Sequence, residues 1–287
     1  MDSNKNFRGL ALEGGGVSAL AHIGVIEELH NREILSNLTH ISGSSAGSII
    51  ATLIACRLSY EQIREAALSI DYAALKDSAW YLVNDIYRLI NRYGWNSGRI
   101  LSEVFGNVLE KYINNRSITF GQIRDNYGTT LIITSTDVTS GTTVYYTPDS
   151  NSDMCVIDAI RESSGIPLFY SPVIKGEHMY VDGCLLNSYP IEKLYDYLPK
   201  EQVFGVKLIP DSPQSIDKIP VNIIEYATKL IKLICYQASK VHIDEDDWKR
   251  TIKVNIGTIC TTDFYLTDEQ KFWLIEQGQI AAKKFFE

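Results

Sequence analysis

The stretch LTHISGSSAGSIIA at residues 38–51 joins a short apolar run to the pattern Gly-x-Ser-x-Gly, and a run of small and apolar residues follows. This order predicts a strand, a tight turn and a helix, with Ser45 at the tip of the turn. Gly43 and Gly47 supply the small neighbours that such a turn needs, because the strand and helix backbones approach each other there. Free N–H groups at the start of the helix would stabilise an anion, which suits acyl transfer. The plain alternative is a turn between strand and helix that carries no chemistry.

The residues before this stretch predict a second unit of the same kind. An apolar run from Phe7 to Leu12 breaks at Glu13 and three glycines, and residues 18–31 have helical periodicity. The first 55 residues therefore predict strand, helix, strand and helix, which is typical of a parallel sheet covered by helices. A chain of 287 residues is long enough for one large core, and we expect a single domain over residues 1–287.

Periodicity and capping signals predict the remaining elements. They are a hairpin of runs 129–136 and 142–146, a helix over 154–163, strands over 179–182 and 203–209, and a helix over 223–241 with Leu230, Ile231 and Ile234 on one apolar face. Capping boxes predict helix starts at Ser59 and Thr267.

Two amphipathic helices are expected between Trp80 and Ile113, with a break at residues 94–98. The first carries five aromatic residues: Trp80, Tyr81, Tyr87, Tyr93 and Trp95. Such a density indicates either ordinary core packing or a lipid-facing surface.

Composition limits the classes of partner. With 45% hydrophobic and 22% charged residues, the chain has the composition of a globular protein. Its net charge of −8 argues against a nucleic-acid partner and restricts contact with anionic membranes to local patches.

The spacing of the cysteines and histidines and the sequence of residues 1–6 bear on the cellular compartment and on metal or cofactor binding. The five cysteines and five histidines are scattered singly, so we expect reduced thiols, no metal and no cofactor. Residues 1–6 do not resemble a signal peptide, and no apolar run reaches the roughly 20 residues that span a bilayer. We therefore expect a cytoplasmic protein, with at most peripheral contact with membranes.

Three candidate site segments follow predicted strands: the glycines at 14–16, Ser45, and Asp182. In an open α/β sheet, ligands bind at the carboxyl ends of the strands, so distant residues can meet there. Backbone N–H groups of the glycine loop would form an oxyanion hole, with Ser45 as nucleophile and Asp182 as its base. A carboxylate with a pKa near 4 is a weak base toward a serine hydroxyl, so burial must make it more basic.

The order of these segments resembles the patatin-like phospholipase family. The matching motifs are LALEGGG at 10–16, GSSAG at 43–47, AIRESSGIP at 159–167, Asp182-Gly183, and NSYP at 187–190. The resemblance covers about residues 7–210, with C-terminal helices at 220–287 packed on that part. It implies a three-layer α/β/α sandwich with a mostly parallel central sheet, and metal-free hydrolysis of acyl esters in phospholipids or acylglycerols, of phospholipase A or lysophospholipase type.

The resemblance also implies residue roles. Ser45 is the nucleophile, Asp182 the general base, and Gly14, Gly15 and Gly16 the oxyanion loop. It implies peripheral contact with membranes and leaves a protein activator open. Two positions depart from the family pattern. Ser18 stands where the family has Arg or Lys, which would weaken oxyanion stabilisation or change head-group preference. Cys184 replaces Gly or Ala and is small enough to fit.

Other interpretations remain open. The sequence GGGVSA at 14–19 also fits a dinucleotide-binding loop, although the second strand lacks the acidic end that such folds use. An α/β-hydrolase triad would use His242, which follows Asp182 in the chain. Asp137 and Asp158 are competing carboxylates; the first would organise a turn, and the second would be solvated or cap a helix. A catalytically silent relative that binds lipid or protein is the non-enzymatic alternative.

Overall fold

The computed structural model describes residues 6–75, 89, 91–211, 219, 223–241, 243–261 and 263–287. The strands are β1 (Gly9–Leu12), β2 (His40–Ser44), β3 (Gly94–Asn96), β4 (Thr130–Asp137), β5 (Thr142–Tyr146), β6 (Leu168–Tyr170), β7 (Val173–Lys175), β8 (His178–Asp182), β9 (Val203–Pro210) and β10 (Thr251–Gly257). The α-helices are α1 (Ala21–Asn31), α2 (Ala46–Ala55), α3 (Tyr60–Ser69), α5 (Arg99–Ile113), α6 (Phe120–Tyr127), α7 (Val156–Ser163), α8 (Ile223–Val241), α9 (Glu245–Lys249) and α10 (Asp268–Phe286).

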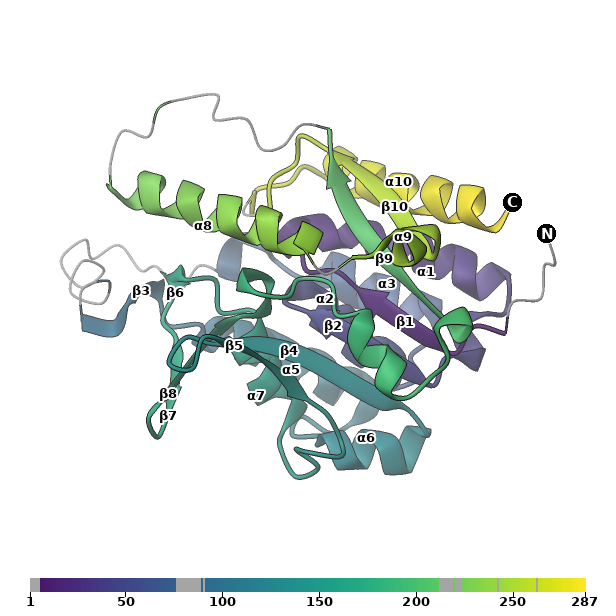
Figure 1. Cartoon of the computed structure of the whole chain (residues 1–287), viewed down its shortest axis with the longest axis horizontal. Coiled ribbons are helices and arrows are strands. Elements are labelled where there is room, and N and C mark those ends of the chain that lie inside the picture. Colours follow the sequence, from purple (N-terminus) through teal and green to yellow (C-terminus); the bar gives the residue numbers. More distant parts are fainter. Residues whose placement is uncertain are drawn as a thin grey trace.

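Within these residues, a central sheet of eight strands has the order β10-β9-β1-β2-β4-β8-β7, and β5 pairs with β4 outside this path (Figure 1). The pairs from β10 to β4 are parallel, whereas β5, β7 and β8 run antiparallel to their neighbours. The mostly parallel sheet of the sequence prediction is confirmed. The strands β7 and β10 were not predicted.

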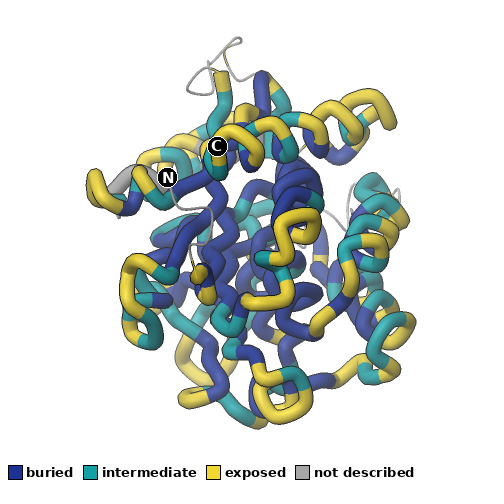
Figure 2. The backbone as a smooth tube through the Cα atoms, turned by 90° about the vertical axis from the view of Figure 1, so that its right-hand side faces the viewer, coloured by how far each residue is buried: buried dark blue, intermediate teal, exposed yellow. Residues whose placement is uncertain are grey.

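A hydrophobic core lies on each face of the sheet, between the sheet and the helices that cover it. Leu10 and Leu12 of β1 belong to the larger core, which includes buried side chains of α1, α2 and α10. Ala11, between them in the strand, belongs to a smaller core with Tyr189 and Leu194 on the opposite face. Figure 2 shows the inner backbone as buried and the outer helix turns as exposed. The alternation along β1 therefore places one helical layer on each side of the sheet, as an α/β/α sandwich requires.

The C-terminal helix α10 packs closely against α1. A Cβ added at Gly24 would lie 1.8 Å from the carbonyl oxygen of Ile275, and one at Gly278 would lie 1.9 Å from that of Ala21. These two glycines let the helix backbones approach each other. The capping boxes predicted at Ser59 and Thr267 are both present and begin α3 and α10.

Most elements lie where the sequence predicts them, including α5, the β4–β5 hairpin, α7 and α8. The expected break at 94–98 contains the short strand β3, which pairs with β6. Trp80, Tyr81 and Tyr87 of the predicted aromatic helix lie outside the described residues. Among the described residues, none of the helices combines the length and apolar character needed to cross a membrane.

Candidate active site

Ser45 lies between the end of β2 and the start of α2, in a strained backbone conformation. Its φ of 49° and ψ of −128° are uncommon for a residue with a side chain. A Cβ added at Gly43 would lie 2.5 Å from the carbonyl oxygen of Gly47, so the strand and helix meet too closely for larger residues. The geometry is that of the sharp strand-to-helix turn predicted from the sequence.

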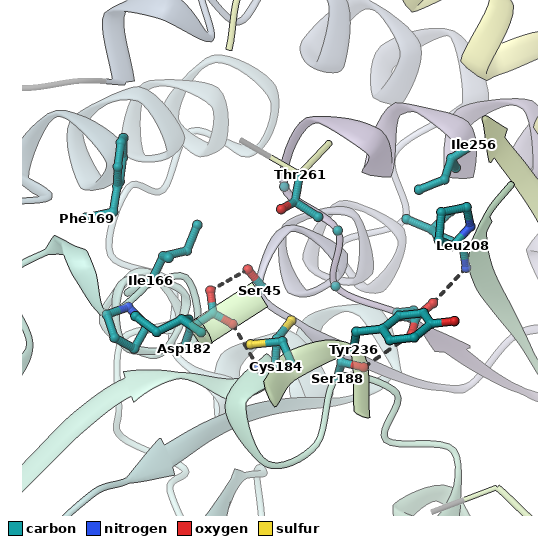
Figure 3. A pocket seen from close by; sticks show the side chains of 18 of the residues that line it. Ser45, Ile166, Phe169, Asp182, Cys184, Ser188, Leu208, Tyr236, Ile256 and Thr261 are labelled. Carbon is teal, nitrogen blue, oxygen red and sulfur yellow. Dashed lines mark hydrogen bonds between the residues drawn. The ribbon is translucent and has the colours of Figure 1, made fainter. Parts of the chain in front are cut away.

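The hydroxyl of Ser45 contacts the carboxylate of Asp182 directly. Its Oγ donates a hydrogen bond to Oδ2 at 2.8 Å, and the N–H of Cys184 donates to Oδ1, also at 2.8 Å (Figure 3). Both side chains are buried. Burial raises the pKa of Asp182 to about 6, although the hydrogen bonds from Cys184 and Ser45 work in the opposite direction. A carboxylate with this pKa is a stronger base than an ordinary aspartate and is still ionised at neutral pH.

The sheet register brings these two residues together from positions 137 residues apart in the chain. Ser44 pairs with Thr134 of β4 on one side, and Asp182 pairs with Ser135 on the other side. The strand ends meet at one edge, as expected. Asp182, however, ends an antiparallel strand, because β8 follows β7 in a hairpin rather than a helical crossover.

The glycine loop at 14–16 lies beside this pair. The N–H of Gly14 donates to the carbonyl of Ser188 at 3.0 Å. Within the part of the chain that the structure describes, the N–H groups of Gly15 and Gly16 donate no hydrogen bond. Gly16 has a φ of 53°, and a Cβ there would lie 2.0 Å from the carbonyl oxygen of Thr261. A glycine is therefore required at position 16, and two N–H groups remain available for a ligand.

Glu13, the residue before these glycines, is held by a buried ion pair that was not predicted from the sequence. The carboxylate of Glu13 contacts Lys207 Nζ and accepts hydrogen bonds from the N–H of Leu208 at 2.7 Å and from Ser188 Oγ at 3.2 Å. Both charged side chains are almost completely buried. The signal was present in the sequence: Lys207 is a single lysine within the apolar strand β9, where a buried cation needs an acidic partner.

The other candidate residues lie away from Ser45. Asp137 accepts hydrogen bonds from the N–H of Thr139 and the hydroxyl of Ser140 and contacts His178, so it organises its turn as predicted. Asp158 is exposed in the first turn of α7.

Two further positions were singled out in the sequence. Ser18 is fully buried and does not line the cavity described below. His242 lies outside the described residues.

A mostly apolar cavity of about 330 Å³ opens above the Ser45–Asp182 pair. Its apolar lining comes from Ile166, Phe169, Leu208, Ile231, Ile256 and Phe264. Figure 3 shows Ile166 and Phe169 on one side of the pair, and Leu208 and Ile256 on the other. The rings of Phe169 and Phe264 stack with centroids 5.1 Å apart. The cavity combines a mostly apolar surface with the polar Ser45–Asp182 pair, as a site for an acyl chain requires.

Comparisons with known proteins agree with this fold. The family model described as Patatin-like phospholipase matches residues 10–195, and the chain belongs to this family, whose members are lipid hydrolases. The protein R571 of Acanthamoeba polyphaga mimivirus is 27% identical over 289 residues, which cover 98% of this chain and 94% of that protein. YqhO of Bacillus subtilis is 28% identical over 284 residues, or 95% of each chain. The crystal structure of VipD from Legionella pneumophila matches with a TM-score of 0.67 at 17% identity, covering 98% of this chain and 67% of VipD.

Proposed function

We propose that the protein is a carboxylic ester hydrolase of phospholipase A or lysophospholipase type, which cleaves acyl esters of phospholipids or acylglycerols through an acyl-enzyme on Ser45. The observation that carries the proposal is the 2.8 Å hydrogen bond from Ser45 Oγ to Asp182 Oδ2 beneath an apolar cavity. A nucleophile in contact with its base, next to a surface that fits an acyl chain, is the minimum arrangement for this reaction.

In the first half of the reaction, Ser45 Oγ attacks the ester carbonyl carbon while Asp182 Oδ2 accepts its proton. The N–H groups of Gly15 and Gly16, together with the N-terminus of α2, would stabilise the negative oxygen of the tetrahedral intermediate. Asp182 then returns the proton to the leaving alcohol. In the second half, Asp182 takes a proton from the water that attacks the acyl-enzyme, and it then returns this proton to Ser45 Oγ as the fatty acid is released.

The direct contact favours a dyad over a triad that includes histidine. The two oxygens of Asp182 accept hydrogen bonds from Ser45 and from the N–H of Cys184, so the carboxylate does not need an intermediate imidazole to reach the serine. In a Ser-His-Asp triad, the histidine lies between the other two groups.

The test is the turnover of a short soluble ester by three variants, with circular dichroism to verify folding. Asp182→Asn keeps the shape of the side chain and should lower kcat by about 10² to 10⁴, the usual contribution of a general base. Ser45→Ala should remove nearly all turnover. Asp137→Asn is the matched control, because it removes a buried carboxylate that organises a turn, and its kcat should stay within a few-fold of the wild type.

Three results would contradict the proposal. They are substantial turnover in Ser45→Ala, normal turnover in Asp182→Asn, and a folded His242→Gln variant without activity. The last would favour the triad. Mass spectrometry of the products from phosphatidylcholine and lysophosphatidylcholine then assigns the phospholipase A or lysophospholipase type.

A further inference from the structure

Helix α8 has apolar side chains both toward the cavity and toward the outside. Toward the interior, Ile231 and Cys235 line the cavity above Ser45. Toward the outside, Tyr226, Leu230, Leu233 and Ile234 have exposed fractions of 51%, 42%, 52% and 50%. The apolar face predicted from the sequence divides in the structure, because Ile231 lines the cavity whereas Leu230 and Ile234 are about half exposed.

The four exposed residues follow the spacing i, i+4, i+7 and i+8, which confines them to an arc of about 100° around the helix. On the same helical wheel, Ile231 lies about 60° and Cys235 about 100° from Ile234, on the side of the helix that borders the cavity. We call Tyr226, Leu230, Leu233 and Ile234 the outer face of α8. Four large apolar side chains that are each about half exposed on one helix face indicate a surface that contacts something other than water.

We propose that the outer face of α8 docks on the surface of a phospholipid membrane and holds the substrate cavity next to it. This inference rests on the proposed function, because the substrate of that reaction resides in lipid aggregates. One helix, about 10 Å across with its side chains, separates the outer face from the cavity. A docked α8 would therefore bring the cavity close to the lipid from which an acyl chain must enter.

The contacts of α8 connect the outer face to the active site. The helix packs on the 3-10 helix η4 (Gly183–Leu185), which follows Asp182, and on β6, which carries Phe169 of the cavity wall. In Figure 1, α8 lies beside the sheet, above β6. A membrane that contacts α8 thus contacts an element that rests directly on the catalytic segment.

The charge of the helix favours a phospholipid surface as the occupant. The sequence of α8 contains three lysines and one glutamate, whereas the whole chain has a net charge of −8. Helices that lie in the membrane interface combine an apolar face with lysines around it and place aromatic residues such as Tyr226 at head-group depth. Lys229 flanks the outer face on the helical wheel.

The experiment measures flotation of the full chain with vesicles of phosphatidylcholine containing a minor fraction of phosphatidylglycerol. All variants carry Ser45→Ala, so that the vesicles are not hydrolysed during the measurement. Leu230→Glu/Leu233→Glu should lower the partition coefficient at least about tenfold, because two apolar contacts are replaced by charges that resist burial. Leu230→Gln/Leu233→Gln should give a smaller loss in the same direction.

The matched control is Phe272→Glu/Ile280→Glu on α10, whose two side chains are each 51% exposed and do not line the cavity. Its partition coefficient should stay within about twofold of the parent. The same surface substitutions are also made in protein that retains Ser45. These variants should turn over a short soluble ester within about twofold of the wild type. Such turnover tests the proposed function independently of vesicle binding.

Three results would overturn the docking proposal. They are a parent protein that does not float with vesicles, a Leu230→Glu/Leu233→Glu variant that floats like the parent, and an equal loss in the α10 control. If the parent protein does not float, the outer face would instead contact a protein partner or a second copy of the chain. A different result would contradict the proposed function, namely turnover of the soluble ester that persists in Ser45→Ala.

Discussion

Replacing Asp182 by asparagine should lower turnover and, in addition, make the variant increasingly stable relative to the wild type as the pH rises. The carboxylate is buried, and burial raises its pKa from 3.8 to about 6. The folded protein therefore holds the Asp182 proton more tightly than the unfolded chain does. The stability from this proton is fully present below about pH 3.8 and is lost as the pH rises through about 6. Asparagine has no proton to lose, so the variant does not share this decrease.

The magnitude follows from the two pKa values. Their difference corresponds to about 3 kcal/mol over the complete titration. Between about pH 4.5 and about pH 7.5, the part of the titration that experiment can reach, the loss is about 2 kcal/mol. The free energy of unfolding of Asp182→Asn minus that of the wild type should therefore increase by about 2 kcal/mol over this window. A constant offset from the altered hydrogen bonds to Ser45 and Cys184 does not change this increase.

Urea unfolding at a series of pH values, followed by circular dichroism, measures this difference. Asp158→Asn is the control, because it removes an exposed carboxylate of α7, and its difference from the wild type should stay within about 0.5 kcal/mol. A flat or decreasing difference for Asp182→Asn would contradict the raised pKa of Asp182, since ionisation of this carboxylate would then not lower the free energy of unfolding.

Three further predictions concern the surroundings of Ser45. The pH–rate profile of kcat/KM for a soluble ester should fall about tenfold per pH unit below about pH 6, because only the ionised base accepts a proton. Gly16→Ala should lower kcat about 10²-fold or more in steady-state assays, because it displaces the glycine loop. Gly128→Ala, with a φ of 66° and open space around it, should keep kcat and lose roughly 1–2 kcal/mol of stability in thermal melts. Glu13→Gln should destabilise the fold by about 3–5 kcal/mol in urea unfolding, and adding Lys207→Met should recover part of that loss.

Local signals in the sequence predicted much of the fold. The capping boxes at Ser59 and Thr267 depend on residues three apart, so their sequence spacing is sufficient to find the helix starts. The turn at Ser45 is also local, since Gly43 and Gly47 flank it. The structure reproduces all of these features.

Features that depend on distant partners were harder to predict. The direction of β8 depends on its hairpin with β7 and on register with β4, which no short pattern contains. The partner of Glu13 lies 194 residues away at Lys207. Periodicity predicts an apolar face for α8, yet only the folded structure separates residues that face the cavity from those that face outward.

Covalent labelling of the wild-type protein with a fluorophosphonate, followed by peptide mass spectrometry, tests directly whether Ser45 is the nucleophile. We expect one adduct per chain, located on Ser45, because this serine hydroxyl contacts a buried carboxylate base. Labelling should be slower in folded Asp182→Asn and absent in Ser45→Ala. An adduct on another residue, or no adduct on Ser45 in protein that hydrolyses esters, would contradict the claim that Ser45 and Asp182 form the catalytic pair.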